Sequence, residues 1–250
     1  MGIEQLTVEY VEHSGSDLSV VNAARVSYDK RSEALGYSGI EGRPMTPVIN
    51  DVDKKLIKYL ADHEHYSPFN HAFVTFRCSA PLFVMGQLKK HEYMPWNEVS
   101  RRYISDTPSF YTPSEWRGKP KNSKQGSDGT VELGSSVPLG KCLYLAISSY
   151  EGLIEQGVAP EQARMVLPQS MMSSWIWSGT IKAVAKMCKL RLKSDTQYES
   201  RVIANLISEE MYDLFPYSWS ALMGKNFPII REMNQDERKR ALERSKANRI

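Results

Sequence analysis

The sequence predicts an α+β fold, built mainly of helices with a few strands in its first hundred residues. Two patterns predict this fold. Apolar and polar residues alternate in short runs at 5–12 and 71–80, as they do in half-buried strands. Elsewhere apolar residues recur at helical spacing, most clearly in 51–65 and throughout 139–214.

The first fifty residues predict a strand, a helix and a loop, in that order. The strand covers 5–12. Asp17 is placed to cap the helix that follows, over 17–30. Residues 31–50 contain Gly, Pro and Ser and therefore predict a loop. The helix carries apolar residues at helical spacing, namely Leu18, Val21 and Ala24.

Residues 51–65 predict the clearest helix of the chain, opened by Asp51. The strand at 71–80 follows. Pro81 interrupts that strand and is placed to begin a second helix at its first position, and Pro95 ends this helix. The apolar stripe of the first helix comprises Val52, Leu56, Tyr59 and Leu60, and one face of the second comprises Leu82, Met85 and Leu88.

The second half of the chain predicts an exposed loop followed by helices. Residues 104–138 are rich in Ser, Gly, Pro and Lys, so we expect an exposed loop there. Gly157 suits a helix end and Pro160 suits the next helix start. The predicted helices cover 139–157, 160–175 and 180–214, and a charged tail covers about 230–250.

Composition excludes several classes of protein. The net charge of +3 is too small to indicate a nucleic-acid coat. The three cysteines are widely spaced and form no CxxC pair, so we expect no disulfide framework, no metal site and a reducing, cytoplasmic compartment. We expect no signal peptide and no membrane span, because no apolar segment has the required length and flanks.

The densest polar segment is 87–103, QLKKHEYMPWNEVSRRY. Cations, a hydroxyl and a turn backbone together suit a phosphate monoester, since Arg presents a planar fork to phosphate oxygens. Glu98 would repel phosphate and is better suited to accept a hydrogen bond from a sugar hydroxyl or a flavin. The alternative interpretation is a solvated charged turn between helices, and spacing alone leaves both open.

Two further patterns have a functional and a structural interpretation. His63, His65 and His71 are close in sequence, but the spacing is not HExxH and no Cys is near, so a turn after a helix is the simpler account. Lys182, Lys186 and Lys189 share one face of a predicted helix. This basic face is either the wet side of a core helix or a surface for an anionic cofactor. Trp175, Trp177, Met171 and Met172 are interpreted as core.

Ordered motifs along the chain resemble the flavin-dependent thymidylate synthase (ThyX) family. Lys-His-Glu at 90–92, seven residues and Ser100 resemble the family's Arg-His-Arg, seven residues, Ser, and NEVSRRY resembles its continuation. Four more segments resemble family motifs in the same order, and the sequences of these motifs look closest to those of bacteriophage-type members. These segments are AARVSY, HYSPFNH, ARMVLP and LRLKSDTQYESR.

The resemblance implies a single α/β domain over 1–250, with a small antiparallel or mixed sheet flanked by helices, assembled as a homotetramer. It implies reductive methylation of dUMP to dTMP, with methylenetetrahydrofolate as carbon donor and NADPH as reductant of bound FAD. A flavin-supplied hydride is consistent with the absence of a nucleophile, because no Cys follows a Pro here. If the protein is phage-encoded, the compartment is the host cytoplasm.

The resemblance also assigns residues. Arg191 would polarise the uracil ring, because a guanidinium stays charged when buried and can stabilise negative charge on the pyrimidine. The dUMP-binding residues implied are Gln87, Lys90, Glu98, Ser100, Arg101, Arg102, Arg164 and Arg191. The FAD-binding residues implied are Ser27, Ser67, Lys90, His91, Glu92, Glu98, Thr180, Lys182 and Lys186.

The chain departs from the family pattern at four of these positions. Lys90 and Glu92 replace the two signature arginines, and Thr180 and Lys182 stand where the family usually has Asn and Arg. Lys90 keeps the positive charge of Arg but lacks its planar guanidinium fork, whereas Glu92 inverts the charge. A pair between Glu92 and a nearby Lys, in place of a contact with the flavin, would compensate for this inversion. Two alternatives therefore accompany the main hypothesis: a flavin- and folate-dependent pyrimidine nucleotide hydroxymethylase, and a non-catalytic nucleotide-binding relative.

Overall fold

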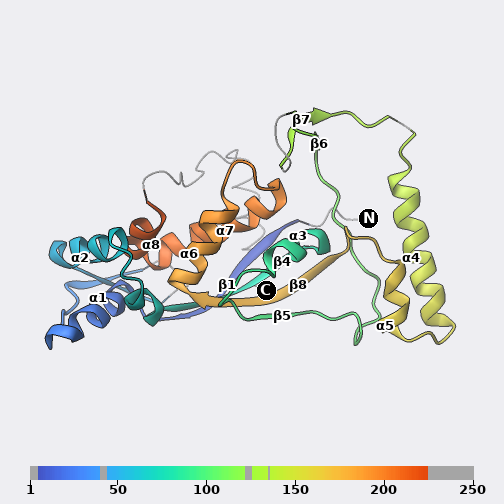
Figure 1. Cartoon of the computed structure of the whole chain (residues 1–250). Helices are drawn as coiled ribbons and strands as arrows, with labels where there is room; N and C mark the ends of the chain where they lie inside the picture. Colours follow the sequence, from blue (N-terminus) through green and yellow to red (C-terminus); the bar gives the residue numbers. More distant parts are fainter. Residues whose placement is uncertain (1–4, 40–43, 122–125, 135, 225–250) are drawn as a thin grey trace. The chain divides into compact units, whose positions relative to one another are not determined.

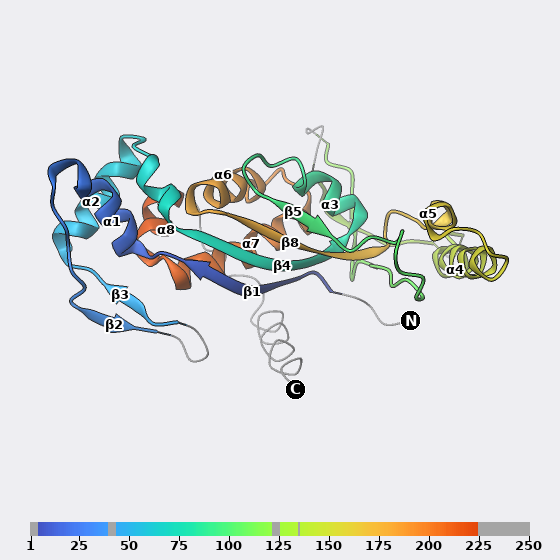
Figure 2. The same ribbon diagram turned by 90° about the horizontal axis from the view of Figure 1, so that it is seen from below.

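The structure is a computed structural model that describes residues 5–39, 44–121, 126–134 and 136–224. This part contains eight α-helices and eight strands. A four-stranded sheet has the order β1-β4-β8-β5, and two hairpins, β2-β3 and β6-β7, form separate two-stranded sheets (Figures 1 and 2). The predicted α+β class is therefore confirmed, with a small sheet. The charged tail at about 230–250 lies outside the described residues.

The chain forms two compact units, which are described separately. Unit 1 comprises residues 1–8, 77–177 and 193–203, and unit 2 comprises 9–76, 178–192 and 204–250. No helix in the described part of the chain is long and apolar enough to cross a membrane.

The sheet confirms two predicted strands and adds two that the sequence pattern did not reveal. β1 (Thr7–Ser14) and β4 (Phe73–Pro81) occupy the predicted positions. β5 (Trp96–Glu98) pairs antiparallel with β8 (Met172–Thr180), in a register that places Trp96 opposite Trp177 and Glu98 opposite Trp175.

The prediction of one helix over 160–175 is wrong. Only α5 (Pro160–Ala163) and a 3-10 turn, η3 (Arg164–Val166), are helical. Leu167 precedes Pro168 and takes an extended conformation, as the residue before a proline usually does. β8 then begins, and its buried Trp175 and Trp177 alternate with exposed Ile176 at the period of a strand.

Helix α1 (Asp17–Arg25) starts one residue earlier than a cap at Asp17 would place it, because Ser16 and not Asp17 is its N-cap. Ser16 and Ser19 form a reciprocal capping box. Asp17 is fully buried instead, and its carboxylate accepts hydrogen bonds from the backbone N–H groups of Tyr217 and Ser218 at 3.0 and 2.8 Å. It therefore caps α8 (Pro216–Met223), a helix that the sequence pattern did not predict. Burial raises the pKa of Asp17.

Helix α2 (Asp51–Asp62) is confirmed, but its predicted apolar stripe is wrong in part. Val52 and Tyr59 are 66% and 51% exposed, whereas the buried face consists of Asp53, Ile57 and Leu60. A charged residue occupies the inward face because Asp53 is paired with Arg25, and hydrophobicity alone does not reveal such a pair.

Both segments predicted as loops contain hairpins. β2 (Gly36–Ser38) pairs with β3 (Thr46–Val48), and β6 (Trp116–Gly118) pairs with β7 (Asp128–Val131). The strands have only three or four residues, which is too short for an alternating pattern to stand out.

Helix α3 (Leu82–Leu88) is shorter than predicted, and Pro81 precedes it as the N-cap residue. The helix ends at Leu88, seven residues before Pro95, and Tyr93 takes a positive φ of 61° in the turn that follows. The predicted placement of Lys90, His91 and Glu92 on the end of a helix is therefore wrong: they lie in this turn.

The predicted helix over 180–214 is two helices, α6 (Ile181–Arg191) and α7 (Tyr198–Leu214). A turn in which Thr196 N–H donates to the Lys193 carbonyl separates them. Ser, Asp and Thr side chains in this segment compete with helical hydrogen bonds. Helix α4 (Leu139–Glu155) agrees with its prediction, and Gly157 follows it with a φ of 82°.

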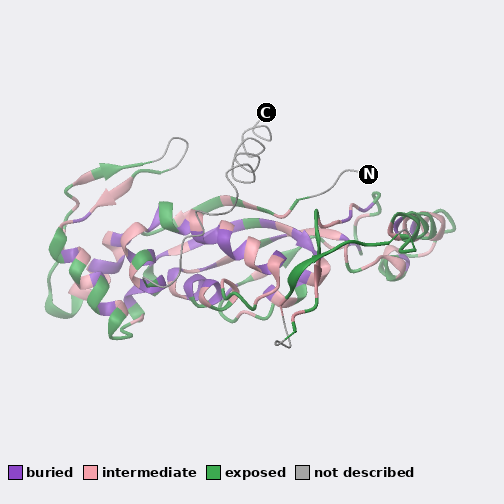
Figure 3. Ribbon diagram, turned by 90° about the horizontal axis from the view of Figure 1, so that it is seen from above, coloured by how far each residue is buried: buried purple, intermediate pink, exposed green. Residues whose placement is uncertain are grey.

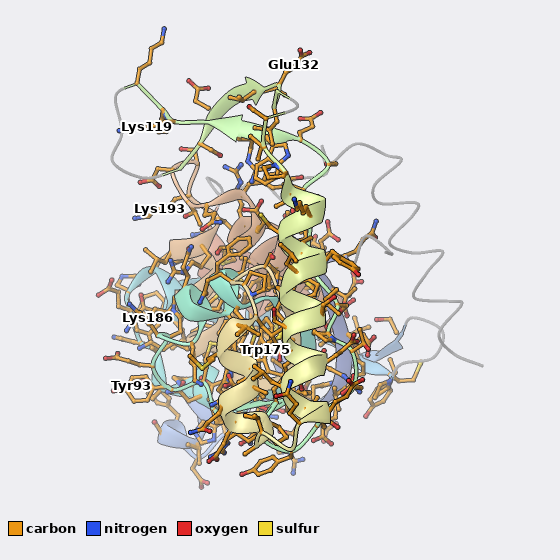
Figure 4. All side chains as sticks on the ribbon, turned by 90° about the vertical axis from the view of Figure 1, so that its right-hand side faces the viewer. Tyr93, Lys119, Glu132, Trp175, Lys186 and Lys193 are labelled. Carbon is orange, nitrogen blue, oxygen red and sulfur yellow. The ribbon has the colours of Figure 1, made fainter. Side chains whose placement is uncertain are left out.

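Each unit has its own buried residues. In unit 2, helices α1, α2, α6 and α8 and the 3-10 turn η2 (Ser67–His71) pack together. In unit 1, strands β4 and β8 and helix α3 contribute buried residues, whereas few residues of α4 are buried (Figure 3). Leu143 of α4 packs on Phe110 and Met171. Trp175, 2% exposed, lies within unit 1, and the Lys119, Lys193 and Glu132 side chains extend to the surface (Figure 4).

Candidate active site

The turn after α3 and strand β5 bring a carboxylate between two donors in unit 1. Glu98 Oε2 accepts a hydrogen bond from Trp96 Nε1 at 2.7 Å and one from Lys89 Nζ at 3.0 Å. Burial raises the pKa of Glu98, but the Trp96 and Lys89 hydrogen bonds, with the charges of Lys89 and Arg164, outweigh burial and lower the pKa overall. Glu98 is thus held as a carboxylate near two cations.

Arg164 begins the 3-10 turn η3, and its exposed guanidinium lies near enough to Glu98 to lower that carboxyl's pKa. Its Nε donates to the Glu161 carbonyl at 3.2 Å. Two of the predicted nucleotide-binding residues, far apart in sequence, therefore lie in one region of unit 1.

The residues directly after β5 differ in burial: Arg102 is exposed, whereas Arg101 is buried. Ser100 Oγ accepts hydrogen bonds from Arg102 N and Nε at 3.4 and 3.3 Å, and Arg102 is exposed. Arg101 is buried: its guanidinium donates to the Asp106 carbonyl and lies 5.7 Å from the centroid of the Tyr150 ring. Arg101 therefore holds the turn after β5, while Ser100 is half-buried and Arg102 is exposed.

Gln87, near the end of α3, belongs to a hydrogen-bonded network with the start of α7. Gln87 Nε2 donates to Gln197 Oε1, and Gln87 Oε1 accepts from Ser200 Oγ at 3.1 Å. Gln197 Nε2 in turn donates to Glu199 Oε2 at 3.1 Å. The predicted substrate residue Gln87 is thus oriented by residues that lie more than a hundred positions further along the chain.

Glu199 is the buried anchor of this network. It is 3% exposed and lies in the first turn of α7, where a negative charge is favourable. Arg117 of β6 forms an ion pair with its Oε1, and the Tyr111 hydroxyl donates to the same oxygen at 3.4 Å. Arg117 also donates to Ser127 Oγ at 3.0 Å.

The signature segment itself lies beside an aromatic cluster. Trp96 stacks on Trp175 with ring centroids 4.4 Å apart, and the His91 ring lies 6.3 Å from that of Trp177. Lys90 and Glu92 are exposed. The predicted core role of Trp175 and Trp177 is confirmed, because both are buried.

In unit 2, the start of α6 gathers most of the remaining predicted cofactor residues. Thr180 is the N-cap: its Oγ1 accepts from Ala183 N–H at 3.2 Å and donates to Asn70 Oδ1 at 2.9 Å. Lys182 Nζ lies 3.8 Å from the centroid of the Tyr66 ring. Ser67, the first residue of η2, is exposed.

Helix α6 has the two faces that the sequence predicts. Val184, Met187 and Cys188 are fully buried, whereas Lys186 is exposed. Arg191 is the last residue of the helix and partly buried, and burial lowers its pKa.

The 3-10 turn η1 (Val26–Tyr28) carries Ser27, which is exposed. Arg25 immediately before it donates to Asp53 Oδ1 from Nε at 3.0 Å and from Nη2 at 2.5 Å. Ser32 Oγ and Asn50 Nδ2 also donate to the fully buried Asp53 carboxylate. The network fixes the backbone from which Ser27 projects.

The histidines form ring contacts. The Tyr59 ring centroid lies 4.0 Å from that of His63 and 6.0 Å from that of His65, and the two histidine centroids are 6.2 Å apart. Within the described residues, no group of three or more side chains is arranged to hold a metal ion.

The predicted site residues thus form two groups. Unit 1 holds Gln87, Lys90, His91, Glu92, Glu98, Ser100, Arg101, Arg102 and Arg164, and unit 2 holds Ser27, Ser67, Thr180, Lys182, Lys186 and Arg191. Sequence reasoning missed the partners that orient them, among them Gln197, Glu199 and Arg117. A signal existed for the first two, because they occupy the Gln-x-Glu of the matched TQYESR segment.

Comparison with known proteins places the chain in a family. Residues 9–217 match the Thy1 family, described as thymidylate synthase complementing protein. A flavin-dependent thymidylate synthase of Thermus thermophilus is 35% identical over 86% of this chain and 74% of the relative, and one of Kosmotoga olearia is 33% identical over 94% and 96%.

A solved structure is also similar. It is the UMP/dUMP methylase PolB of Streptomyces cacaoi bound with 5-Br UMP, which is 28% identical with a TM-score of 0.70 over 87% of this chain and 93% of that chain. The family match and the named relatives confirm the resemblance that the sequence motifs indicate. The chain therefore belongs to the Thy1 family of thymidylate synthase complementing proteins, in which its most similar relatives include flavin-dependent thymidylate synthases.

Proposed function

We propose that this protein is a flavin-dependent thymidylate synthase, a methyltransferase that converts dUMP to dTMP. The observation that carries the proposal is the grouping of Glu98, Arg164 and the Ser100–Arg102 pair in unit 1. It combines guanidinium groups and a hydroxyl, which suit a phosphate, with one carboxylate, which suits a sugar or base donor. The names of the relatives support the same reaction.

The residues of unit 2 fit a flavin dinucleotide by their donor chemistry. The N-terminus of α6 favours anions, and Lys182 and Lys186 add positive charge close to it. The Thr180 hydroxyl is fixed by Asn70, so it is held in place before a ligand binds. We propose FAD as the flavin, with Ser27, Ser67, Lys90, His91 and Glu92 as further contacts and with Glu98 shared between flavin and dUMP.

The Lys182–Tyr66 contact supports this assignment despite the departure from the family's Arg. A Lys over a ring face is held by the ring quadrupole, so its ammonium is positioned without the fork of a guanidinium. Lys90 makes the same exchange of Arg for Lys in the signature.

The reaction needs a group that stabilises negative charge on the uracil ring, and Arg191 is proposed for that role. A partly buried guanidinium keeps its charge and acts more strongly away from bulk water. A reduced flavin, when bound, would supply the hydride, and methylenetetrahydrofolate and NADPH would supply the carbon and the reducing equivalents.

An enzyme thiol is not required in this scheme. Cys188 is fully buried among the apolar residues of α6, and burial raises the pKa of its thiol. Cys78 is also buried. Thiols in such surroundings are poor nucleophiles.

We propose a homotetramer whose subunits share the active sites, as the family resemblance implies. Sedimentation equilibrium measures this directly: a mass near four times 28.5 kDa supports it, and a monomer contradicts it.

Flavin binding tests the proposal without turnover. The purified protein should bind added FAD and show the flavin absorbance bands. Lys182→Ala should weaken FAD binding by about tenfold, the equivalent of one charge-assisted contact. Lys58→Ala on α2, which removes an exposed Lys paired with Asp62, is the matched control and should leave FAD binding unchanged. A wild-type protein that ignores FAD would contradict the proposal.

A hydroxymethylase remains the second candidate, motivated by Glu92 in place of a signature Arg. In this alternative, the inverted charge of Glu92 changes the fate of the transferred carbon. The product mass distinguishes a methyl from a hydroxymethyl group. A non-catalytic nucleotide-binding relative would bind dUMP but form neither product.

A further inference from the structure

The network that ends at Glu199 fixes which atoms Gln87 can present to a ligand. A carboxylate only accepts hydrogen bonds, so the side of the Gln197 amide that faces Glu199 must be its NH2 group. Gln197 then presents its oxygen to Gln87, and Gln87 presents its own NH2 group in return. Ser200 Oγ, which donates to Gln87 Oε1, closes the arrangement.

The orientation is transmitted because each amide has one donor side and one acceptor side. Without a fixed end, two amides in contact can both rotate by half a turn at little cost. The buried carboxylate of Glu199 removes this freedom, since a rotated Gln197 would point its oxygen at a negative charge. Such a contact between two acceptors is unfavourable in a buried site.

Glu199 is 3% exposed, and a buried carboxylate is stabilised by a counter-charge. Arg117 supplies it through an ion pair, and the Tyr111 hydroxyl donates to the same oxygen. Arg117 is itself held by Ser127 and by the Tyr198 ring, whose centroid is 4.5 Å from Cζ. The β6–β7 hairpin, whose composition predicts an exposed loop, thus supplies the cation that stabilises the buried end of the network.

We propose that Glu199 is a positioning residue for nucleotide recognition: through Gln197 it sets the amide orientation of Gln87, and its ion pair with Arg117 holds it in place. The inference rests on the proposed function, because Gln87 is there assigned to dUMP. With Nε2 bonded to Gln197 and Oε1 bonded to Ser200, the orientation of the Gln87 amide is fixed. The sides on which its donor and its acceptor lie relative to a bound pyrimidine nucleotide are fixed with it.

Glu199→Gln tests the inference, because Gln preserves the volume of Glu while it adds a donor and removes the charge. The variant should raise the KM for dUMP by about tenfold, the fold-change expected for the loss of one well-placed hydrogen bond. Its kcat should stay within about twofold of the wild type, because no group that acts only in the transition state has been removed.

Asp17→Asn is the matched control, since it also converts a fully buried carboxylate into an amide. Asp17 caps α8 in unit 2 and has no bond to the Gln87 network. It should lower the Tm and leave the KM for dUMP unchanged. An equal rise of KM in both variants would assign the Glu199 effect to general destabilisation and overturn the inference.

A double-mutant cycle shows whether Glu199 acts through Gln87. In a Gln87→Ala background, Glu199→Gln should raise the KM by less than about twofold, because the residue it orients is gone. An undiminished tenfold rise in that background would refute the inference. If Glu199→Gln does not fold, Gln197→Met takes its place: it removes the amide link at similar volume and should raise the KM to the same extent, and an unchanged KM would refute the inference.

The wild-type protein separates this inference from the proposed function. If the wild type forms no dTMP and does not bind dUMP, the proposed function fails. If it does both while Glu199→Gln and Gln197→Met retain the wild-type KM, only the positioning role fails.

Discussion

Lys89 Nζ lies 3.0 Å from Glu98 Oε2, and this contact joins the turn after α3 to strand β5. Trp96 Nε1 donates to the same oxygen, so a single carboxylate oxygen organises the segment that carries the family signature. Both hydrogen bonds use Oε2, so neither Trp96 nor Lys89 occupies the other carboxylate oxygen, Oε1.

The first prediction concerns pH. The folded-state pKa of Glu98 is lower than its ordinary value of 4.5, so its contribution to stability is present above about pH 4.5 and is lost as the pH falls through the lowered pKa. The side chain is 38% exposed, so this contribution is small, about 0–1 kcal/mol as for other exposed pairs. Glu98→Gln should therefore flatten slightly the fall of the free energy of unfolding between pH 5 and 3, measured by urea titration, and an unchanged pH profile would argue against the ion pair.

The second prediction separates catalysis from stability on helix α6. Arg191→Ala should lower kcat by roughly 10²–10³, as the loss of a group that stabilises developing charge does, with little change in Tm. Val184→Ala should do the reverse, because Val184 is fully buried and its truncation costs about 1.5–3 kcal/mol. Leu190 would be a poor control for this purpose, because it is 46% exposed. An equal loss of stability in both variants would contradict the catalytic role proposed for Arg191.

The third prediction concerns the ion pair between Arg25, which precedes the turn that carries Ser27, and the buried Asp53. Arg25→Ala leaves the Asp53 carboxylate buried without its cation, which should cost about 3 kcal/mol of the free energy of unfolding. The double change of Arg25→Met and Asp53→Leu should recover part of the loss, because neither charge then remains buried. Urea titration of the wild type, Arg25→Ala and the double variant tests this. A double variant less stable than Arg25→Ala would contradict the prediction, and would show that the two charges stabilise the fold through partners other than each other.

The sequence predicted the elements whose pattern is long and whose interior is apolar. β1, β4, α2, α4 and the two faces of α6 follow from periodicity. β8 was mistaken for a helix because Met171-Met172 and the two tryptophans also suit a buried helix, and only the alternation of Trp175, Ile176 and Trp177 distinguishes the two. The strands of the two hairpins are too short to have a period.

The site residues could be predicted only where a family motif marks them, and their assignment remains a prediction. The partners of these residues were less accessible. Arg117 lies in a segment whose Gly, Lys and Ser content indicates a solvated loop, yet its guanidinium forms an ion pair with a carboxylate that is 3% exposed. Asp17 was assigned to the helix it begins, whereas its carboxylate caps a helix 200 residues later. Long-range pairs of this kind leave no local pattern.

The most direct test of the account is the mass of the nucleotide formed from dUMP by the purified protein with FAD, NADPH and methylenetetrahydrofolate. The account predicts dTMP, a gain of one methyl group, and no product when FAD is omitted from flavin-free protein. A hydroxymethylated nucleotide would contradict the proposed reaction, and the return of unchanged dUMP from protein that binds both FAD and dUMP would contradict the proposal that the chain is an enzyme.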